Sequence, residues 1–579
     1  MPNSYKPPKP KAHPIDYLVK KAEAGFKKTL AKETKELSAA AKAYRKRRGR
    51  HPPPGFDKWF EYTTGSEGII VEDFFDQIYH DLAPFWGVDP QRIRRLAHHF
   101  DHVVSVRNGT TTVKTDMGVR EWVENWTNMV SVLEEWLPDV DVPLNVMDES
   151  RVIVPWEDID KAVRAERNSS RILPKKDVVT ESSSLSGLDA NPGEAVQVEW
   201  HGPKESMWDI ARVGCAPKSP SRDKEPAADL SGPPPMPSGF PKHSWQGYVQ
   251  NWTIAKDPCL NPDLRESHGT FIEPLSTATT HEMLPIFGGS KLPMNNDILI
   301  PPAMYWSQNP MFHADDHGPE WEKKELKLIW RGGASGGRNK KENWTRFQRH
   351  RFLSMVNGTA VQAAERNPEA AGRGPNFVLQ SYKTYHLTST QYMDLGSWLD
   401  KFSDAGFVHL SCFPSTDGPN CPYTDPYYEI KSNLKLGEQY KSKFLPDIDG
   451  NSFSGRYLSF LRSTSLPIKA TIYSEWHDSR LAPWVHFVPM DNSFVDIYGI
   501  LDYFIGTGRE YKVPKTGEIL MEGSHDAAAK KIALAGKQWA ELVLRPEDML
   551  IYMMRLLMEW ARVCDDQREK MGFVGDLKN

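Results

Sequence analysis

A short apolar strand that runs directly into a glycine-rich loop is the feature that most restricts how this chain can fold. Apolar residues stand at every second position, Leu326, Leu328 and Trp330, and residues 331–338 then read R-G-G-A-S-G-G-R. The alternation predicts a buried strand, and the glycines end it. Glycines let backbone N–H groups approach an anion closely, and an arginine guanidinium binds phosphate oxygens in pairs. The stretch therefore indicates a site for a diphosphate, with Arg331, Gly333 and Arg338 as candidate ligands.

Glycine-rich turns after strands also occur without any ligand. This loop lacks both the Lys-Ser/Thr ending of a P-loop and the G-x-G-x-x-G spacing of a dinucleotide fold. A second loop of the same kind strengthens the interpretation, because residues 447–456 read D-I-D-G-N-S-F-S-G-R and precede the apolar run Tyr457–Leu461. Two such loops in one half of a chain favour a site with two walls. Asp447 and Asp449 have the letters of a D-x-D metal motif, but we interpret them as part of a turn and predict no metal site.

A carboxylate follows another predicted strand, in the first half of the chain. Residues 140–146 read V-D-V-P-L-N-V and lead to Met147, Asp148 and Glu149. Open α/β sheets place their working residues at the carboxyl ends of strands, which makes Asp148 a candidate general base. The alternative is that Asp148 only caps the next turn.

Length and charge limit the class of protein. The chain has 579 residues, which predicts two packed domains with extensions, and a net charge of −4, which gives no overall electrostatic footprint for nucleic acid. No window approaches the ~20 apolar residues of a membrane span, and no signal peptide opens the chain. Either the protein is cytosolic and its N-x-Ser/Thr sequons are accidents, or an N-terminal anchor is missing from this chain. The six sequons begin at Asn108, Asn125, Asn168, Asn251, Asn343 and Asn357.

The five cysteines show no zinc spacing and no dense disulfide framework. Cys412 and Cys421 are close enough in sequence for a local bridge, and Cys215 with Cys259 could clip an insertion. These spacings leave the compartment open.

The start of the chain is basic. Residues 1–14 are rich in proline and lysine and are predicted to be disordered. Apolar residues then recur at helical spacing from Ile15 to Tyr44, within fifty residues that hold fifteen Lys/Arg against four Asp/Glu. We interpret this segment as a solvated stem helix with a basic face rather than as an arm for nucleic acid or acidic lipid.

Strands and helices alternate in both halves, which predicts an α/β fold with parallel sheets. Further strands are expected at 376–380 and 468–473, and helices at 495–504, 526–544 and 546–564. The predicted domains are a disordered start and stem at 1–55, an N-terminal domain at 56–320 with a Ser- and Pro-rich, partly disordered insertion at about 160–285, a nucleotide-binding domain at 321–545, and a closing helix and tail at 546–579.

A series of motifs in a fixed order resembles glycosyltransferase family 90, which contains fungal capsule-associated xylosyltransferase-like proteins and animal protein O-glucosyltransferases with KDEL-type signals. The resemblance covers roughly residues 50–570. The motifs are N-V-M-D at 145–148, G-S-K with D-I-x-x-P at 289–301, W-R-G-G at 330–333, G-N-S-F-S-G-R at 450–456, S-E-W at 474–476 and P-W-V-H-F-V-P at 483–489.

The resemblance implies a GT-B architecture, in which two Rossmann-like domains face each other across a cleft, and an inverting, metal-independent transfer from a UDP-sugar. Asp148 matches the catalytic aspartate of the family, Gly333 and Arg338 match donor-binding positions, and 451–456 matches the run around UDP. Gly333 replaces a serine of animal members, the first loop is one residue shorter, and Gly455 replaces an aromatic residue. The implied donor-binding residues of the second loop are Asn451, Ser452, Phe453, Ser454, Gly455 and Arg456.

Two further residues are candidates for the cleft. His486 lies in a buried-looking strand, so a core histidine is the default, although the family pattern places it near the cleft. Glu475 could bind sugar or ribose hydroxyls. We expect no cofactor apart from the UDP-sugar substrate.

The expected activity is transfer of a sugar, xylose before glucose because the layout resembles the fungal branch, to a hydroxyl of a glycan or glycoprotein in the Golgi or ER lumen. The alternatives are an inactive carbohydrate-binding or scaffold protein on the same fold, and a glycoside hydrolase, which would need two carboxylates flanking one bond. Membrane contact is expected only through an anchor that is absent from this chain.

Overall fold

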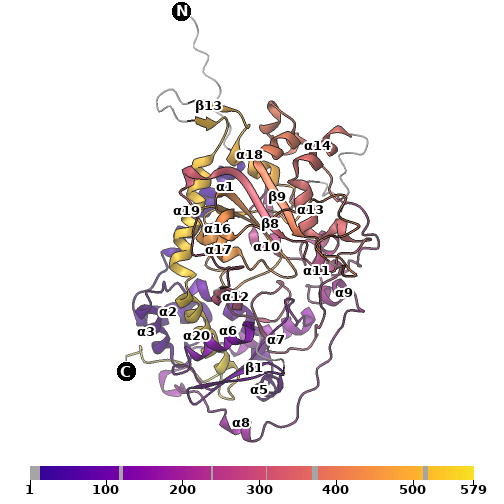
Figure 1. Ribbon diagram of the computed structural model, residues 1–579. Helices are drawn as coiled ribbons and strands as arrows, with labels where there is room; N and C mark the ends of the chain where they lie inside the picture. The colour runs from indigo at the N-terminus through magenta and orange to yellow at the C-terminus, as the bar shows by residue number, and fades with distance from the viewer. Residues whose placement is uncertain are drawn as a thin grey trace, which may run out of the picture.

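Two lobes, one above the other in Figure 1, make up the computed structural model of this chain. The structure describes residues 13–116, 121–235, 239–307, 309–367, 376–416, 418–512 and 519–578. Most of the second half of the chain forms the upper, C-terminal lobe, and most of the first half forms the lower, N-terminal lobe. The predicted disordered start at 1–14 lies outside the described residues up to position 12.

The C-terminal lobe is built on a parallel sheet, which has five strands in the described residues. Its strands are β8 (Glu325–Gly333), β9 (Ser403–His409), β10 (Ser442–Ile448), β11 (Leu466–Ala470) and β12 (Val488–Pro489). Their order in the sheet is β12-β11-β10-β8-β9, and every neighbouring pair is parallel. The predicted parallel α/β sheet is thus confirmed for this half of the chain.

The strand order indicates where a binding site is expected. The chain moves outward from β8 to β9, then returns past β8 to β10 and continues outward on the other side to β12. In doubly wound sheets, ligands bind outside the carboxyl ends of the two strands at which this direction reverses. Those strands are β8 and β10, and both glycine-rich loops begin at their carboxyl ends.

Helices cover both faces of this sheet, and the expected helices at 495–504 and 526–544 are confirmed. The expected strand at 376–380 is wrong, because only Val378 forms a bridge there. The strand that the sequence analysis did not predict is β9, because Gly406 interrupts its apolar pattern. A Cβ at Gly406 would lie 2.5 Å from the Lys431 side chain. The elements are α13 (Gln348–Met355), α14 (Gly358–Arg366), α15 (Leu395–Phe402), α16 (Leu436–Gln439), α17 (Tyr457–Arg462), α18 (Ile497–Ile505), α19 (Asp526–Val543), β13 (Glu510–Lys512) and β14 (Ile519–Met521).

The N-terminal lobe has both antiparallel and parallel pairs, so the prediction of a parallel sheet in this half is only partly confirmed. β1 (Val103–Arg107) pairs antiparallel with both β2 (Thr110–Lys114) and β3 (Val140–Pro143). The cause is the turn Asn108-Gly109, whose residues have φ values of 47° and 70°, as a two-residue hairpin loop requires. Beyond β3, Leu144 bridges in parallel to Phe287 of β6 (Phe287–Gly288), which pairs in parallel with β7 (Ile298–Leu299).

The helices of this lobe lie around the mixed sheet. They are α3 (Phe56–Gly65), α4 (Asp76–Leu82), α5 (Pro90–His99), α6 (Glu121–Ser131), α7 (Trp156–Ser169) and α12 (Ala303–Trp306).

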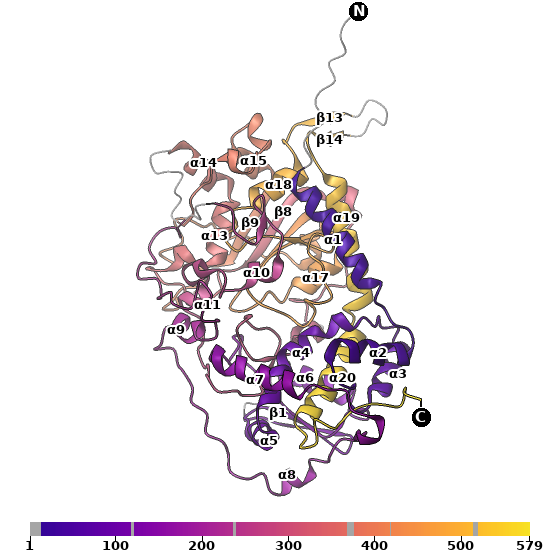
Figure 2. The same ribbon diagram turned by 180° about the vertical axis from the view of Figure 1, so that it is seen from behind.

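The expected solvated stem is two packed helices. Ile15 and Leu18 of α1 (Pro14–Leu30) are buried against the C-terminal lobe, whereas Tyr44 of α2 (Leu37–Arg48) is buried in the N-terminal lobe. Figure 2 shows α1 beside α19 and α2 in the lower lobe. Several basic residues of this segment form ion pairs with carboxylates of the same protein. These side chains therefore do not form a free basic face. These pairs are Arg45–Asp576, Arg47–Asp76, Arg48–Glu72 and Arg50–Glu166.

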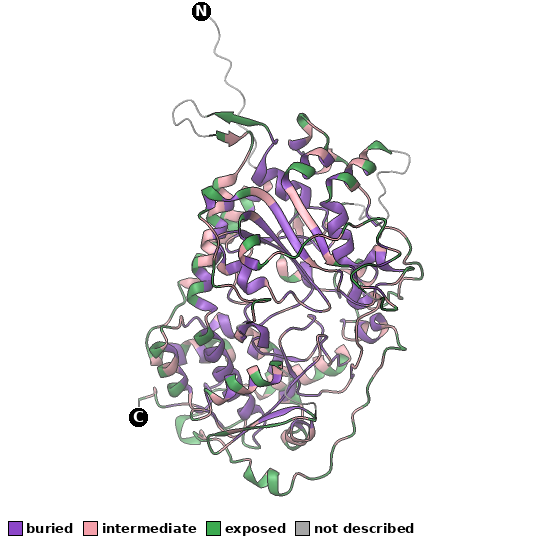
Figure 3. Ribbon diagram, in the orientation of Figure 1, coloured by how far each residue is buried: buried purple, intermediate pink, exposed green. Residues whose placement is uncertain are grey.

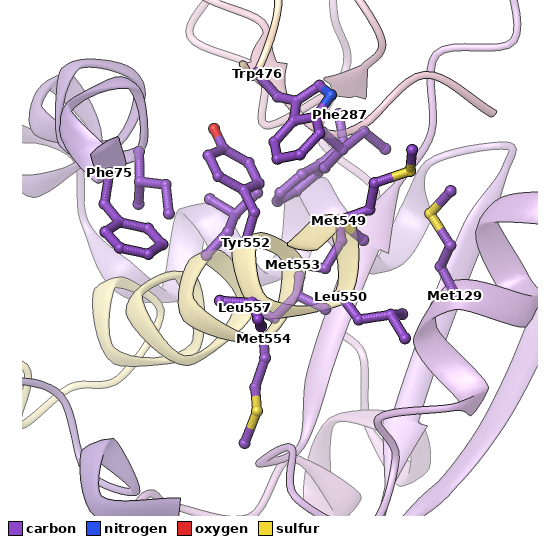
Figure 4. Close-up of a cluster of buried hydrophobic side chains, with 14 of the residues drawn as sticks. Phe75, Met129, Phe287, Trp476, Met549, Leu550, Tyr552, Met553, Met554 and Leu557 are labelled. Carbon is purple, nitrogen blue, oxygen red and sulfur yellow. The ribbon is translucent and has the colours of Figure 1, made fainter. Parts of the chain in front are cut away.

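Helix α20 (Pro546–Val563) closes the chain by packing into the N-terminal lobe, where the expected helix at 546–564 is confirmed. It is buried on nearly all sides (Figure 3). In Figure 4, Tyr552 of α20 faces Trp476 of the C-terminal lobe, and their ring centroids are 5.3 Å apart. Burial of such aromatic pairs stabilises the contact between the lobes and fixes their relative position. None of the helices in the described ranges is both long and apolar enough to cross a membrane.

The predicted insertion at 160–285 contains short helices and a hairpin and packs against both lobes. Trp208 is buried against Phe271, with ring centroids 5.1 Å apart, and a disulfide joins Cys215 to Cys259. The disulfide expected between Cys215 and Cys259 is thus confirmed. The insertion ends close to the first glycine loop. Its elements are α8 (Ser186–Ala190), α9 (Met207–Arg212), β4 (Ser244–Trp245), β5 (Tyr248–Val249), α10 (Trp252–Lys256) and α11 (Gly269–Ile272).

Candidate functional site

Two loops meet at the carboxyl ends of β8 and β10. We call residues 334–338 the first loop and residues 449–456 the second loop. The side chain of Asn451 joins them, because its Oδ1 accepts hydrogen bonds from the backbone N–H groups of Gly336, at 3.0 Å, and Gly337, at 3.2 Å. The two loops identified in the sequence therefore form one site.

Asp148 reaches the same site from the other lobe. Asn145 shapes the turn that carries it, since its Nδ2 donates to the Glu149 carbonyl and its Oδ1 accepts from the Met147 N–H. The turn leaves the Asp148 side chain partly exposed, with Oδ2 3.3 Å from Nδ2 of Asn451. The candidate base and both loops thus lie within one chain of hydrogen bonds.

A small hollow opens beside Asp148. Trp122 of α6 and Met304 of α12 line it from the N-terminal lobe, and Phe453 lines it from the second loop. The hollow therefore combines one carboxylate with apolar and aromatic side chains from both lobes.

The neighbouring carboxylate does not point into this site. Glu149 is buried and accepts hydrogen bonds from the backbone N–H and the hydroxyl of Ser276. Burial raises the pKa of Glu149, while the bonds from Ser276 oppose that rise. The two adjacent carboxylates therefore occupy different environments, and only Asp148 faces the loops.

Helix α13 holds the base of both loops through residues that the sequence analysis did not single out. Arg349 donates to the carbonyls of Gly333, Ile448 and Asp449 and to the Ser335 hydroxyl. Burial, together with the nearby Arg456, lowers the pKa of Arg349 to about 9. The available signal was the charged stretch Q-R-H-R at 348–351, which is buried throughout.

Gln348 joins the second loop to α11. Its Nε2 donates to the carbonyls of Asp449 and Gly450, at 3.3 and 3.1 Å, and its Oε1 accepts from the Gly269 N–H. The loops are therefore held by side chains of a helix rather than only by each other.

Arg456 lies beneath the second loop with part of its charge unused. One guanidinium nitrogen, Nη1, donates to the Arg331 carbonyl, and the group packs between the rings of Trp330 and Phe460. The other, Nη2, is buried without a hydrogen-bond partner, as is the hydroxyl of Ser454. Burial lowers the pKa of Arg456, and Asp447 partly offsets the effect. A buried guanidinium nitrogen without a partner in the protein is uncommon, which makes Arg456 a candidate donor to an external ligand.

Each of the two aspartates with D-x-D spacing has one carboxylate oxygen bound within the protein, and its other oxygen, Oδ1, is buried without a hydrogen-bond partner. Asp447 Oδ2 lies 2.8 Å from Nζ of Lys469, and Asp449 Oδ2 accepts from the Ile472 N–H at 2.8 Å. Glu475 also belongs to this buried group, since its carboxylate contacts Lys469 at 3.4 Å and accepts from the Tyr305 hydroxyl. Burial opposes the charge on Lys469, but Asp447 and Glu475 raise its pKa above the ordinary value. These carboxylates therefore neutralise a lysine beneath the loop.

The arginines of the first loop point elsewhere. Arg331 forms an ion pair with Asp404 at 2.8 Å, on the β9 side of β8. Arg338 donates from Nε to the Leu275 carbonyl and lines a separate hollow below the insertion. The guanidinium groups of Arg331 and Arg338 therefore do not share the contacts of the Arg456 guanidinium.

The two glycines that differ from the family pattern, Gly333 and Gly455, have different surroundings. A Cβ on Gly333 would meet no atom within 4 Å, so a serine would fit there. A Cβ on Gly455 would lie 2.3 Å from Sδ of Met304 and 2.9 Å from the Phe312 ring, so a side chain there requires these two side chains to shift. Ser452 is buried and lines the hollow beside Asp148.

His486 is a core residue. Its ring stacks on Trp539 of α19, with centroids 5.6 Å apart, and lies edge-on to Phe26 of α1. Burial lowers the pKa of His486 to about 3, so the ring is neutral at physiological pH. The default reading as a core histidine therefore fits this geometry.

A second disulfide supports the first loop. The expected bridge between Cys412 and Cys421 is confirmed. It closes the segment after β9, and the hydroxyl of Tyr423 from this segment donates to the Asn339 carbonyl, directly after the first loop.

Residues 422–571 match the model of glycosyl transferase family 90. This segment is similar to that family. It contains the second loop, the S-E-W and P-W-V-H-F-V-P motifs and the whole of α18, α19 and α20, so the resemblance noted in the sequence is confirmed there. Asp148 and the first loop lie outside it.

A curated relative gives a similar picture. Protein O-glucosyltransferase 2 of Danio rerio is 26% identical over 138 residues, which are 24% of this chain and 24% of the relative. The alignment thus spans about a quarter of the relative that it matches.

Proposed function

We propose that this chain is an inverting glycosyltransferase that moves a sugar from a UDP-sugar to a hydroxyl of a glycan or glycoprotein. The observation that supports it most is the convergence at Asn451, which contacts both the first loop and Asp148 from the second loop. A donor-binding region and a carboxylate of the other lobe are thereby within reach of one substrate. The family 90 segment supports the reaction class.

Asp148 acts as the general base in this proposal. Its carboxylate takes the proton from the acceptor hydroxyl while that oxygen attacks the anomeric carbon of the donor. The bond between the anomeric carbon and the diphosphate oxygen breaks, and UDP leaves with the electron pair. Backbone N–H groups of the loops and Nη2 of Arg456 stabilise the negative charge that develops on the diphosphate.

Two alternatives are less well supported. A glycoside hydrolase needs two carboxylates that flank one bond, but the second carboxylate, Glu149, is engaged by Ser276. An inactive binding protein on this fold would not need a carboxylate beside the loops, whereas Asp148 lies there with one side exposed to the hollow.

The donor is tested directly by incubating the purified protein with each UDP-sugar in excess EDTA. We expect release of UDP, fastest with UDP-xylose and next with UDP-glucose, and little change on adding Mn²⁺. The reason is that Arg456 and loop N–H groups supply the positive charge, while Oδ2 of Asp447 pairs with Lys469 and Oδ2 of Asp449 accepts from the Ile472 N–H. A strict Mn²⁺ requirement would mean that these aspartates change partners and bind metal. Absence of UDP release with every UDP-sugar would contradict the proposed function.

A lumenal location is proposed from the covalent chemistry of the chain. Two disulfides favour an oxidising compartment. The structure divides the sequons into those with a buried and those with an exposed asparagine side chain. Asn343 is buried and its Nδ2 lies against Glu273. Nδ2 of Asn125 is also buried. The sequons with exposed asparagines are at Asn108, Asn168, Asn251 and Asn357.

The protein from its native host is therefore expected to shift in gel mobility after endoglycosidase treatment. Asn→Gln changes at the four exposed sequons should each reduce the shift, and Asn125→Gln should leave it unchanged. Loss of the shift through Asn125→Gln alone, or no shift in the first place, would contradict the assignment.

A further inference from the structure

Asn451 occupies the hydrogen-bonding groups that a donor needs. Its amide oxygen takes the two N–H groups of Gly336 and Gly337, and its amide nitrogen donates to Asp148. The backbone of Asn451 is held separately, because its carbonyl accepts from the Tyr473 hydroxyl at 3.1 Å. The side chain can therefore turn without moving the loop that carries it.

The two N–H groups are arranged for an anion. Gly336 and Gly337 have φ values of 130° and 122°, which residues with a side chain rarely adopt, and a Cβ would lie 2.5 Å from Gln348 Nε2 or 2.3 Å from the Glu273 carbonyl. This conformation aims consecutive N–H groups at one acceptor, as in anion-binding turns. A charged phosphate oxygen is a stronger acceptor there than a neutral amide oxygen.

We propose that Asn451 is a latch that the donor diphosphate opens. A phosphate oxygen takes the N–H groups of Gly336 and Gly337, the amide of Asn451 turns away, and its Nδ2 leaves Asp148. The carboxylate oxygen is then free to accept the proton of the acceptor. Asn451 is thus a positioning residue that makes the base available only after a nucleoside diphosphate sugar has bound, and the inference rests on the proposed function.

A latch and a permanent brace predict opposite effects on ligand binding. In a latch, UDP must break the contacts of Asn451 before it binds, so removing the amide strengthens binding. In a brace, or in a direct donor ligand, the amide remains in place with UDP bound, so removing it weakens binding. The contact with Asp148 adds a second difference, because only in the latch does UDP release it.

The test is calorimetric titration of UDP into wild type, Asn451→Ala, Asp148→Ala and the double variant, with melting curves to verify folding. We expect Asn451→Ala to bind UDP about three- to tenfold more tightly, because two neutral hydrogen bonds no longer compete. Asp148→Ala should give a smaller gain, and the double variant should bind like Asn451→Ala, since both changes remove the same contact. The control is Asn128→Ala, which removes an exposed asparagine that accepts from Trp306 in the N-terminal lobe.

Unchanged or weaker UDP binding by folded Asn451→Ala would overturn the latch. Additive gains in the double variant would do the same, because they would show that the two side chains act separately. Failure of wild type to bind UDP at all would instead refute the proposed function, so the two failures are distinguishable.

Discussion

Asp148→Asn is expected to lower the turnover number by about 10²–10⁴-fold, which is the range that a positioned general base contributes. Asparagine has nearly the same shape but cannot accept the proton of the acceptor hydroxyl. The partly exposed position of Asp148 beside Asn451 makes the loss specific to chemistry rather than to folding. Steady-state rates of transfer, with UDP affinity measured in parallel, test it, and that affinity should change less than tenfold.

Glu149→Gln is the matched control for this experiment. Glu149 is the adjacent carboxylate, but it faces Ser276 and not the loops. Its amide variant should therefore keep most of the turnover. Equal losses in both variants would point to a local structural role for the turn, and retained turnover in Asp148→Asn would remove this residue from the mechanism.

The sequence predicted the two loops because their signals are local. Glycines, hydroxyls and an arginine directly after an apolar run mark a strand followed by an anion-binding turn, and both loops do lie at the reversal point of the parallel sheet. The disulfides were also within reach, since the spacings of Cys412–Cys421 and Cys215–Cys259 each suggested a bridge.

The contacts that make the site could not be read from the sequence. Asn451 touches Asp148 across a separation of 303 residues, and Arg349 reaches the second loop from about 100 residues away. Such pairs depend on how the lobes dock, to which Tyr552 of α20 contributes by packing against Trp476 of the C-terminal lobe. No local pattern encodes that arrangement.

The errors have equally physical causes. A stem helix was expected because the segment is basic, but its charges are paired with carboxylates that are distant in sequence, such as Asp576 for Arg45. Parallel pairing was expected in the N-terminal lobe, although the Asn108-Gly109 turn requires an antiparallel hairpin. Arg331 and Arg338 stay a prediction as phosphate ligands; in this structure their guanidinium groups contact Asp404 and the Leu275 carbonyl.

Substitution of Arg456 is expected to have the second large effect, a loss of UDP affinity. Its buried Nη2 has no partner in the protein and lies beneath the second loop. A hydrogen bond between a guanidinium and a phosphate in a desolvated site contributes about 1.5–3 kcal/mol, so Arg456→Ala should weaken UDP binding about ten- to a hundredfold. Arg456→Lys should recover only part of the affinity, because lysine keeps the charge but loses the planar pair of donors.

Arg331→Lys is the matched control for the lysine variant. Arg331 precedes the first loop in the sequence, but its guanidinium pairs with Asp404. Lysine can keep that ion pair, so UDP affinity should remain close to that of the wild type.

Titration of UDP into the wild type, Arg456→Ala, Arg456→Lys and Arg331→Lys tests most directly whether the two loops form the nucleotide site. The wild type is expected to bind UDP. Compared with the wild type, UDP affinity should be about ten- to a hundredfold weaker in Arg456→Ala, partly restored in Arg456→Lys and nearly unchanged in Arg331→Lys. Equal UDP affinity in the wild type and in folded Arg456→Ala would contradict it.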